Sequence, residues 1–306
     1  MKSTPRSAPR WIRSGTASRY DMAAYKLGLY EKAMPGTLSL AEKLAAAGEA
    51  GYDFMELSID ETDEKLARLD WADGQIRALR RDIEDTGTPI VSICLSGHRR
   101  FPLGDPDKEA RDRGLVIIEK AIGLAARLGA RIIQLAGYDV YYKAGNETTR
   151  AFFAENLARS VEIAAASAVI LAFETMETPF LNTVEKALHW VNRVNSPYLG
   201  VYPDLGNITC AAEGDHTRVR SDLESGRGRI VALHLKETKP GVFREVPYGN
   251  GHVDFVNGVK TAWSLGIRLF TAEFWWTQAA PPDVGGWKTL LQNNGKFLRR
   301  CFQEYA

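Results

Sequence analysis

The sequence has few cysteines and almost no net charge. Three cysteines, Cys94, Cys210 and Cys301, occur among 306 residues, and no two of them form a Cys-x-x-Cys pair. An odd number at wide spacing argues against a disulfide framework and predicts a reducing, cytoplasmic environment. The 39 basic residues are offset by 38 acidic ones, so no nucleic-acid partner is expected.

Long apolar runs are also missing. No segment approaches the roughly 18 residues that a membrane-spanning helix needs, so no membrane partner is expected. The opening stretch MKSTPRSAPRWIRSGTASRYDM carries lysines and arginines but no acidic residue before Asp21. Its prolines disfavour an amphipathic helix, so residues 1–24 are predicted to form a flexible basic tail ahead of one domain over residues 25–306.

The rest of the chain alternates between short apolar segments and longer amphipathic ones. The short segments are rich in β-branched and aromatic residues, as buried strands are. They cover residues 26–30, 54–59, 89–96, 131–137, 169–175, 199–207, 230–237 and 268–275. Two of the longer segments, 107–129 and 146–167, show helical spacing of apolar residues, with Gly129 as a stop and Asn146 as a cap.

Eight strand–helix units predict an α/β fold, a single (β/α)8 TIM barrel. The alternative is an open doubly wound sheet, which usually has fewer strands and often a glycine-rich phosphate turn after the first strand. Here the first predicted strand is followed by EKAMPG, which lacks the Gly-x-Gly-x-x-Gly pattern. The closed barrel is therefore favoured.

One histidine interrupts a predicted strand in RIVALHLKETKPG, residues 229–241. If the leucines on either side of His234 pack beneath the helices, its imidazole points into the barrel near the C-terminal end of the strand, where active sites of this fold lie. The same alternation places Glu174, Asp204 and Glu273 at equivalent positions of three other strands. The four positions follow one another at intervals of 30, 30 and 39 residues, each about one strand–helix unit.

Three carboxylates and an imidazole at one height of a barrel would be costly without a counter-charge. A single strand histidine is more often a hydrogen-bonded core residue, and a single strand glutamate often forms a salt bridge. Four such residues in phase instead favour one divalent metal ion held by Glu174, Asp204, His234 and Glu273. Oxygen-rich ligation with one imidazole favours Mn²⁺ or Mg²⁺, with Zn²⁺ and Co²⁺ as alternatives.

Several long and unusual segments narrow the prediction to a family. They are GLYEKAMP, ELSIDETDEKLARLDW, CLSGHRRFPLG, IQLAGYDVYY, YPDLGN and HLKETKPGVF. From about Lys26 onward the sequence resembles the L-ribulose-5-phosphate 3-epimerases, also called L-xylulose-5-phosphate 3-epimerases, of the xylose-isomerase-like TIM barrel superfamily. The resemblance implies an isomerase that inverts C3 of these pentulose phosphates through a metal-stabilised ene-diolate, and a homodimer or higher homo-oligomer. It also implies that Glu174 and Glu273 are the catalytic pair.

The expected substrate is a small sugar phosphate. Asn207 follows PDLG where related free-ketose 3-epimerases often carry a histidine, and LKETK follows His234 in place of an arginine-bearing segment. Both departures favour a phosphorylated substrate. The predicted substrate contacts are His98, Arg99, Asn207, Lys236 and Lys239. Arginines bind phosphate in a bidentate manner, whereas the lysines follow the seventh strand, near which barrels often bind phosphate.

Other functions compete with this prediction. They are another metal-dependent sugar isomerase, a free-ketose 3-epimerase, a DNA endonuclease on the same barrel, and a sugar-binding barrel without activity. An endonuclease is expected to point several histidines inward and to carry a basic surface, but one histidine is in phase here and the charge is balanced. A protein that merely binds sugar has no need of two opposed carboxylates.

Overall fold

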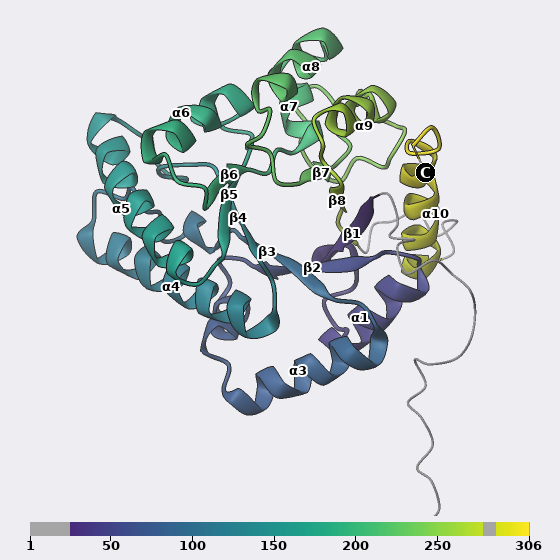
Figure 1. Cartoon of the computed structure of the whole chain (residues 1–306), viewed down its shortest axis with the longest axis horizontal. Helices are drawn as coiled ribbons and strands as arrows, with labels where there is room; N and C mark the ends of the chain where they lie inside the picture. Colours follow the sequence, from purple (N-terminus) through teal and green to yellow (C-terminus); the bar gives the residue numbers. More distant parts are fainter. Residues whose placement is uncertain (1–24, 278–285, 306) are drawn as a thin grey trace, which may run out of the picture.

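The computed structural model describes residues 25–277 and 286–305. Its parallel strands form one sheet in the order β6-β5-β4-β3-β2-β1-β8-β7. The strands are β1 (Lys26–Tyr30), β2 (Phe54–Ile59), β3 (Ile90–Leu95), β4 (Ile132–Ala136), β5 (Ile170–Glu174), β6 (Leu199–Val201), β7 (Leu233–Leu235) and β8 (Leu269–Ala272). Two isolated parallel bridges complete the ring, one from Val201 of β6 to Ile230 and one from Asp204 to His234 of β7, so the predicted barrel is confirmed (Figure 1).

All eight predicted strands overlap an observed strand, but β6 and β7 are shorter than the predicted segments 199–207 and 230–237. Pro203 has no N–H to donate to a neighbouring strand. Asp204 keeps one parallel bridge to His234 and caps α7 (Leu205–Ala211), where its side chain accepts a hydrogen bond from the backbone N–H of Asn207 at 2.6 Å. The strand therefore ends just before its functional residue.

Helices surround the ring of strands (Figure 1). The longer ones are α1 (Leu40–Glu49), α3 (Asp73–Thr86), α4 (Lys108–Leu128), α5 (Glu147–Ala166), α6 (Val184–Val194), α8 (His216–Ser225), α9 (Phe255–Ser264) and α10 (Gly286–Arg300), with α2 (Asp63–Leu66) and the 3-10 turns η2 (Glu31–Ala33), η3 (Ala67–Asp70) and η4 (Gly97–Arg99) between them. The two helices predicted from periodicity are confirmed as α4 and α5. Asn146 caps α5 as predicted, and Gly129 ends α4 with a positive φ of 83° that suits glycine.

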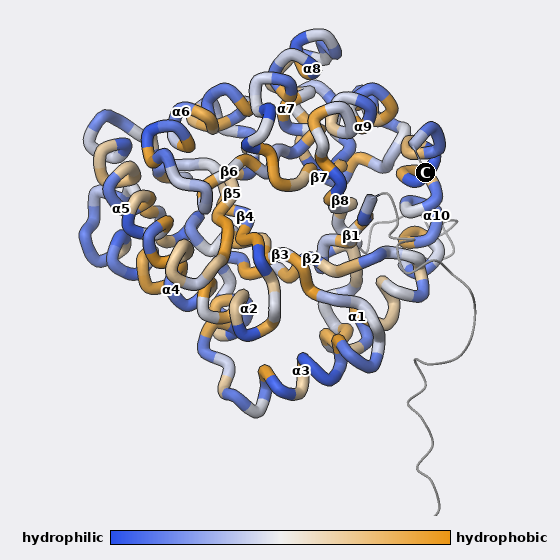
Figure 2. The backbone as a smooth tube through the Cα atoms, viewed as in Figure 1, coloured by the Kyte–Doolittle hydropathy of each residue, from blue (hydrophilic) through white to orange (hydrophobic). Residues whose placement is uncertain are grey.

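The buried apolar residues form three clusters, of which two bear on the site. A large cluster fills the space between strands and helices and includes Leu233 and Leu235, the neighbours of His234. A smaller cluster inside the barrel contains Tyr202 and Ala232. Figure 2 shows hydrophobic residues along much of the ring of strands, whereas hydrophilic and hydrophobic residues alternate along the surrounding helices. The two leucines therefore face the helices, and His234 between them faces the inside of the barrel, as the alternation predicts.

The remaining predictions about the whole chain concern its termini and surroundings. The predicted tail, residues 1–24, lies outside the described residues. Within the described part, no helix is long and apolar enough to cross a membrane. The three cysteines are free thiols.

Candidate metal centre and active site

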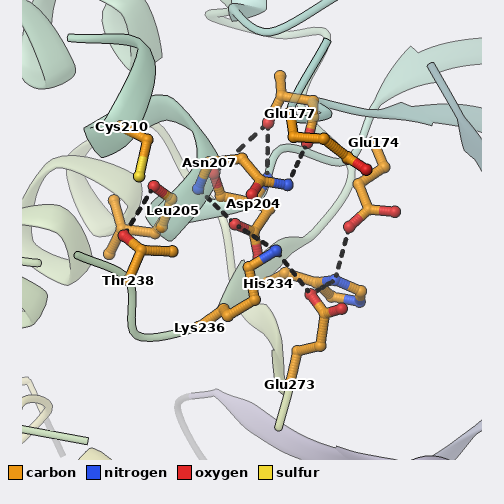
Figure 3. A network of polar contacts seen from close by, with 12 residues as sticks. Glu174, Glu177, Asp204, Leu205, Asn207, Cys210, His234, Lys236, Thr238 and Glu273 are labelled. Carbon is orange, nitrogen blue, oxygen red and sulfur yellow. Dashed lines mark hydrogen bonds and ion pairs between the residues drawn. The ribbon is translucent and has the colours of Figure 1, made fainter. Parts of the chain in front are cut away.

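The four predicted ligands meet at the C-terminal end of the barrel. Glu174 is the last residue of β5, and His234 is the middle residue of β7. Glu273 follows β8 directly, and Asp204 lies shortly after β6, beyond Tyr202 and Pro203. One ligand atom from each residue lies within 4.8 Å of those of the other three, and all four residues are buried. Figure 3 shows their side chains pointing toward one another.

The charges in this cluster are strongly coupled. Burial, and then the charge of Glu273, raise the pKa of Glu174. Burial also raises the pKa of Asp204 well above its ordinary value, although the nearby ammonium of Lys236 opposes this. Burial disfavours ionisation of Glu273 too, but the charges of Lys236 and His234 outweigh it and hold the pKa of Glu273 below its usual range. The positive charges of Lys236 and His234 are therefore too few to keep all three carboxyl groups ionised.

Lys236, a predicted substrate contact, lies inside the cluster. Its Nζ is 3.2 Å from Asp204 Oδ1 and 3.8 Å from Glu273 Oε2. Burial would lower the pKa of Lys236, but the three neighbouring carboxylates, Asp204 first, raise it above its ordinary value. The side chain is therefore a fixed positive charge beside the predicted ligands.

The residues fit a divalent cation. Asp204 Oδ2 is buried and has no hydrogen-bond partner among the described residues, although a buried acceptor without a partner costs about 1–3 kcal/mol. A cation between the four side chains would give that oxygen a partner and would offset the excess of carboxylates. Three carboxylates and one imidazole are ligands that suit a divalent ion.

Two polar residues around His234 were not predicted. Glu56 on β2 is fully buried, and its Oε1 lies 2.7 Å from His234 Nε2. Gln134 on β4 places its Nε2 3.0 Å from His234 Nδ1. Burial would lower the pKa of His234, but the charges of Glu56 and Glu273 raise it well above its ordinary value. Glu56 and Gln134 lie at inward-facing positions of predicted strands. The alternation that predicts the four ligands therefore also points to these two residues.

A pocket opens beside the cluster. Its wall contains Glu174 and Glu273, together with residues of several strands, turns and loops, among them Tyr30, Lys32, Cys94, Ser96, Met176, Phe243 and Trp275. Two arginines also line it. Arg99 lies over the ring of Tyr141 at 5.0 Å, and its buried Nε has no hydrogen-bond partner among the described residues. Arg244, which was not predicted, has its Nη2 3.5 Å from Glu177 Oε1.

The structure brings three of the five predicted substrate contacts to the pocket: Arg99, Asn207 and Lys236. Asn207 Nδ2 donates to the carbonyl of Thr175 at 2.7 Å, and its buried Oδ1 has no partner in the described part of the chain. The other two predicted contacts, His98 and Lys239, are not among the residues that line the pocket.

His98 and Lys239 have different surroundings. His98 is buried, its Nε2 lies 3.1 Å from the carbonyl oxygen of Gly114, and burial lowers its pKa to about 4. Lys239 is exposed, and its backbone forms a short antiparallel bridge with Val242. Arg100, the neighbour of Arg99, is exposed and pairs with Asp63.

The barrel and the buried carboxylate–histidine cluster at its C-terminal end are features of one class of protein, and known protein families match this chain in the same way. Residues 44–301 match the family described as xylose isomerase-like TIM barrel. Within that class, the chain belongs to the L-ribulose-5-phosphate 3-epimerase family. It is 48% identical over 268 residues to an Escherichia coli K12 protein provisionally named L-ribulose-5-phosphate 3-epimerase SgbU, covering 85% of this chain and 92% of the relative.

A second relative supports the same assignment. The chain is 46% identical over 257 residues to L-ribulose-5-phosphate 3-epimerase UlaE of Shigella boydii serotype 18. The matched region covers 84% of this chain and 89% of that protein. The resemblance seen in the sequence is thereby confirmed. The protein is an enzyme, a carbohydrate epimerase.

Solved structures of sugar epimerases share the fold. D-psicose 3-epimerase from Clostridium cellulolyticum H10 matches with a TM-score of 0.74 at 15% identity, covering 90% of this chain and 99% of that chain. A structure of L-ribulose 3-epimerase matches with a TM-score of 0.72 at 18% identity, covering 92% and 96%. At these identities the likeness shows the fold alone.

Proposed function

We propose that the protein interconverts L-ribulose 5-phosphate and L-xylulose 5-phosphate by inverting the configuration at C3. One observation carries this proposal: Glu174 and Glu273 line the same pocket from different strands, within a cluster that suits a divalent cation. Inversion next to a carbonyl needs an acid/base group on each face of the reacting carbon. The names of the two curated relatives, 48% and 46% identical to this chain, support the same substrates.

We propose one divalent metal ion as the cofactor, with Mn²⁺ or Mg²⁺ favoured and Zn²⁺ or Co²⁺ as alternatives. The residues that would hold it are Glu174, Asp204, His234 and Glu273. When bound, such an ion supplies Lewis-acid stabilisation of the negative charge that develops on the substrate oxygens.

The side chains of the protein move the proton. One glutamate of the pair accepts the proton from C3 while the electrons of the C–H bond shift toward the C2 carbonyl. The other glutamate then donates a proton to C3 from the opposite face. Lys236 lies beside Asp204 and Glu273, so its ammonium is placed to donate a hydrogen bond to a substrate oxygen at the reacting end.

The phosphate would lie at the other end of the pocket. Arg99 is the favoured contact because its guanidinium lines the pocket and its Nε is without a partner among the described residues. Arg244 is the second candidate, since it lines the pocket, pairs with Glu177 at 3.5 Å and lies over the ring of Trp275 at 5.8 Å. Arginine binds phosphate with two parallel hydrogen bonds, which suits both positions.

The other predicted contacts receive different roles. We propose that Asn207 uses its free Oδ1 to accept a substrate hydroxyl, and that His98 anchors the η4 turn that carries Arg99. Lys239 remains a predicted contact that would require its loop to approach the pocket. A cytoplasmic location and a homo-oligomeric state also remain predictions.

The most direct test is proton exchange at C3. The purified protein is incubated with L-ribulose 5-phosphate in deuterated water with Mn²⁺, and the products are followed by NMR. Deuterium at C3 together with L-xylulose 5-phosphate is the expected result. Free L-ribulose is the matched control and should react much more slowly. Inversion without deuterium at C3, or equal rates with the free sugar, would contradict the proposal.

A further inference from the structure

Glu56 occupies a position that the proposed reaction does not use. It lies on β2, is fully buried, and is in register with Ser92 on β3. Ser92 Oγ donates to Glu56 Oε2 at 2.6 Å, so one carboxylate oxygen is held by the neighbouring strand. The other oxygen, Oε1, lies 2.7 Å from His234 Nε2. Burying a carboxylate costs free energy unless its oxygens are hydrogen-bonded or paired with a positive charge.

The two ring nitrogens of His234 face different surroundings. Nδ1 lies 2.8 Å from Glu273 Oε2 and 3.7 Å from Glu174 Oε1, so this nitrogen faces the ligand cluster. Nε2 faces Glu56. An ionised carboxylate can only accept a hydrogen bond, so Nε2 must carry the hydrogen of that contact. Nδ1 faces the carboxylate of Glu273 in the same way, so a cation among the four ligands would take the place of a hydrogen on Nδ1 and leave a neutral imidazole whose hydrogen is on Nε2.

We propose that Glu56 is a positioning residue, which holds His234 in the form that presents the Nδ1 lone pair to the metal centre. The inference rests on the metal centre proposed above. A carboxylate behind a ligating histidine fixes the tautomer, orients the ring and makes the imidazole a stronger ligand. Glu56 has the required position and Ser92 fixes its orientation, so β2 and β3 contribute to a site whose ligands come from β5 to β8.

Gln134 is the competing candidate and supplies a matched control. Its Nε2 lies 3.0 Å from His234 Nδ1 and 3.2 Å from His234 Nε2. Nearly equal distances to both nitrogens of one ring place the amide off the lone-pair direction of either one. Gln134 therefore packs against the imidazole without selecting its tautomer, and Gln134→Leu should leave the affinity for metal within about twofold of wild type.

The test compares metal affinity among purified, metal-free variants whose folding is verified by circular dichroism. Glu56→Ala should weaken Mn²⁺ binding, measured by competition with a chelator, by about 10- to 100-fold. Glu56→Gln should lose much less, because its amide oxygen still accepts from Nε2 and its NH₂ can donate to Ser92. Ser92→Ala keeps the carboxylate but releases its second oxygen, and should weaken binding in the same direction as Glu56→Ala.

A spectroscopic measurement reads the contact with Glu56 directly. In the Zn²⁺-loaded protein with ¹⁵N-labelled histidine, the hydrogen on Nε2 of His234 should exchange slowly with solvent in wild type and in Glu56→Gln, and it should exchange faster in Glu56→Ala. Equal metal affinity of wild type and folded Glu56→Ala would overturn the role of Glu56 alone. Equal losses in Glu56→Ala and Glu56→Gln would also overturn it. A wild-type protein that binds no divalent ion would overturn the metal centre itself.

Discussion

Replacing the two glutamates one at a time tests the proposed two-base chemistry most sharply. Glu174→Gln and Glu273→Gln keep the size of each side chain and remove its ability to exchange a proton. A positioned acid/base contributes about 10²- to 10⁴-fold to a rate, so full inversion should fall at least 100-fold in either variant. The remaining glutamate still reaches one face of C3. It should therefore exchange the C3 proton of one epimer with solvent and return it to the same face.

The assay follows deuterium and configuration separately. Each variant is loaded with Mn²⁺, its metal content is measured, and it is incubated in deuterated water with each epimer in turn. We expect the two variants to exchange opposite epimers without inversion, because their surviving glutamates come from β5 and β8. Asp204→Asn is the control: it removes a ligand and no proposed base, so it should reduce inversion and exchange together. A metal-loaded variant that inverts C3 at nearly the wild-type rate would refute the paired-glutamate mechanism.

Three further predictions concern metal, phosphate and stability. Removing the metal with a chelator should abolish turnover and lower Tm, since an ion at 100 times its Kd stabilises the folded state by about 2.7 kcal/mol; unchanged Tm and activity after verified removal would contradict this. Arg99→Ala should raise KM for the sugar phosphate roughly 10- to 100-fold, whereas Arg100→Ala, on an exposed neighbour, should not; equal effects would place the phosphate elsewhere. Burial opposes ionisation of Glu31, but the hydrogen bond and charge of Arg68 outweigh it and lower the pKa of Glu31. The stability that Glu31 contributes is therefore present above the unfolded-state pKa of about 4.3 and is lost as pH falls below it. Glu31→Gln should destabilise the fold by about 3–5 kcal/mol at neutral pH and flatten the acid branch of the unfolding curve.

Much of the barrel could be predicted because each strand is a short apolar run between helical patterns. The alternation within the strands placed the side chain of His234 correctly, since a residue's inward or outward direction is fixed by its neighbours in the same strand. The ends of β6 and β7 could not be predicted as well. They depend on Pro203 and on the cap of α7, where local hydrogen bonding replaces strand pairing.

The ligand cluster could be predicted from spacing, and the same alternation points Glu56 and Gln134 inward, but their contacts with His234 could not be predicted. Glu56 lies more than a hundred residues before His234, and only closure of the ring brings them within 2.7 Å. Arg244 follows β7 in an irregular loop, where no periodicity indicates the direction of a side chain. His98 illustrates the opposite error. It sits beside arginines in a loop that reaches the pocket, yet its imidazole turns inward to the α4 backbone at Gly114.

The proposed metal centre lies where the β6 and β7 segments meet, so a bound ion would also contribute to holding the ring of strands closed. The described backbone crosses this join through bridges that pair Val201 with Ile230 and Asp204 with His234. The second bridge is therefore made by two of the proposed ligands. An ion bound by Asp204 and His234 would link the β6 and β7 segments, which are joined by isolated bridges where the other neighbouring strands form regular ladders. Without the ion, this join would rely on its backbone hydrogen bonds, among them the one from the N–H of His234 to the carbonyl of Pro203 at 2.9 Å.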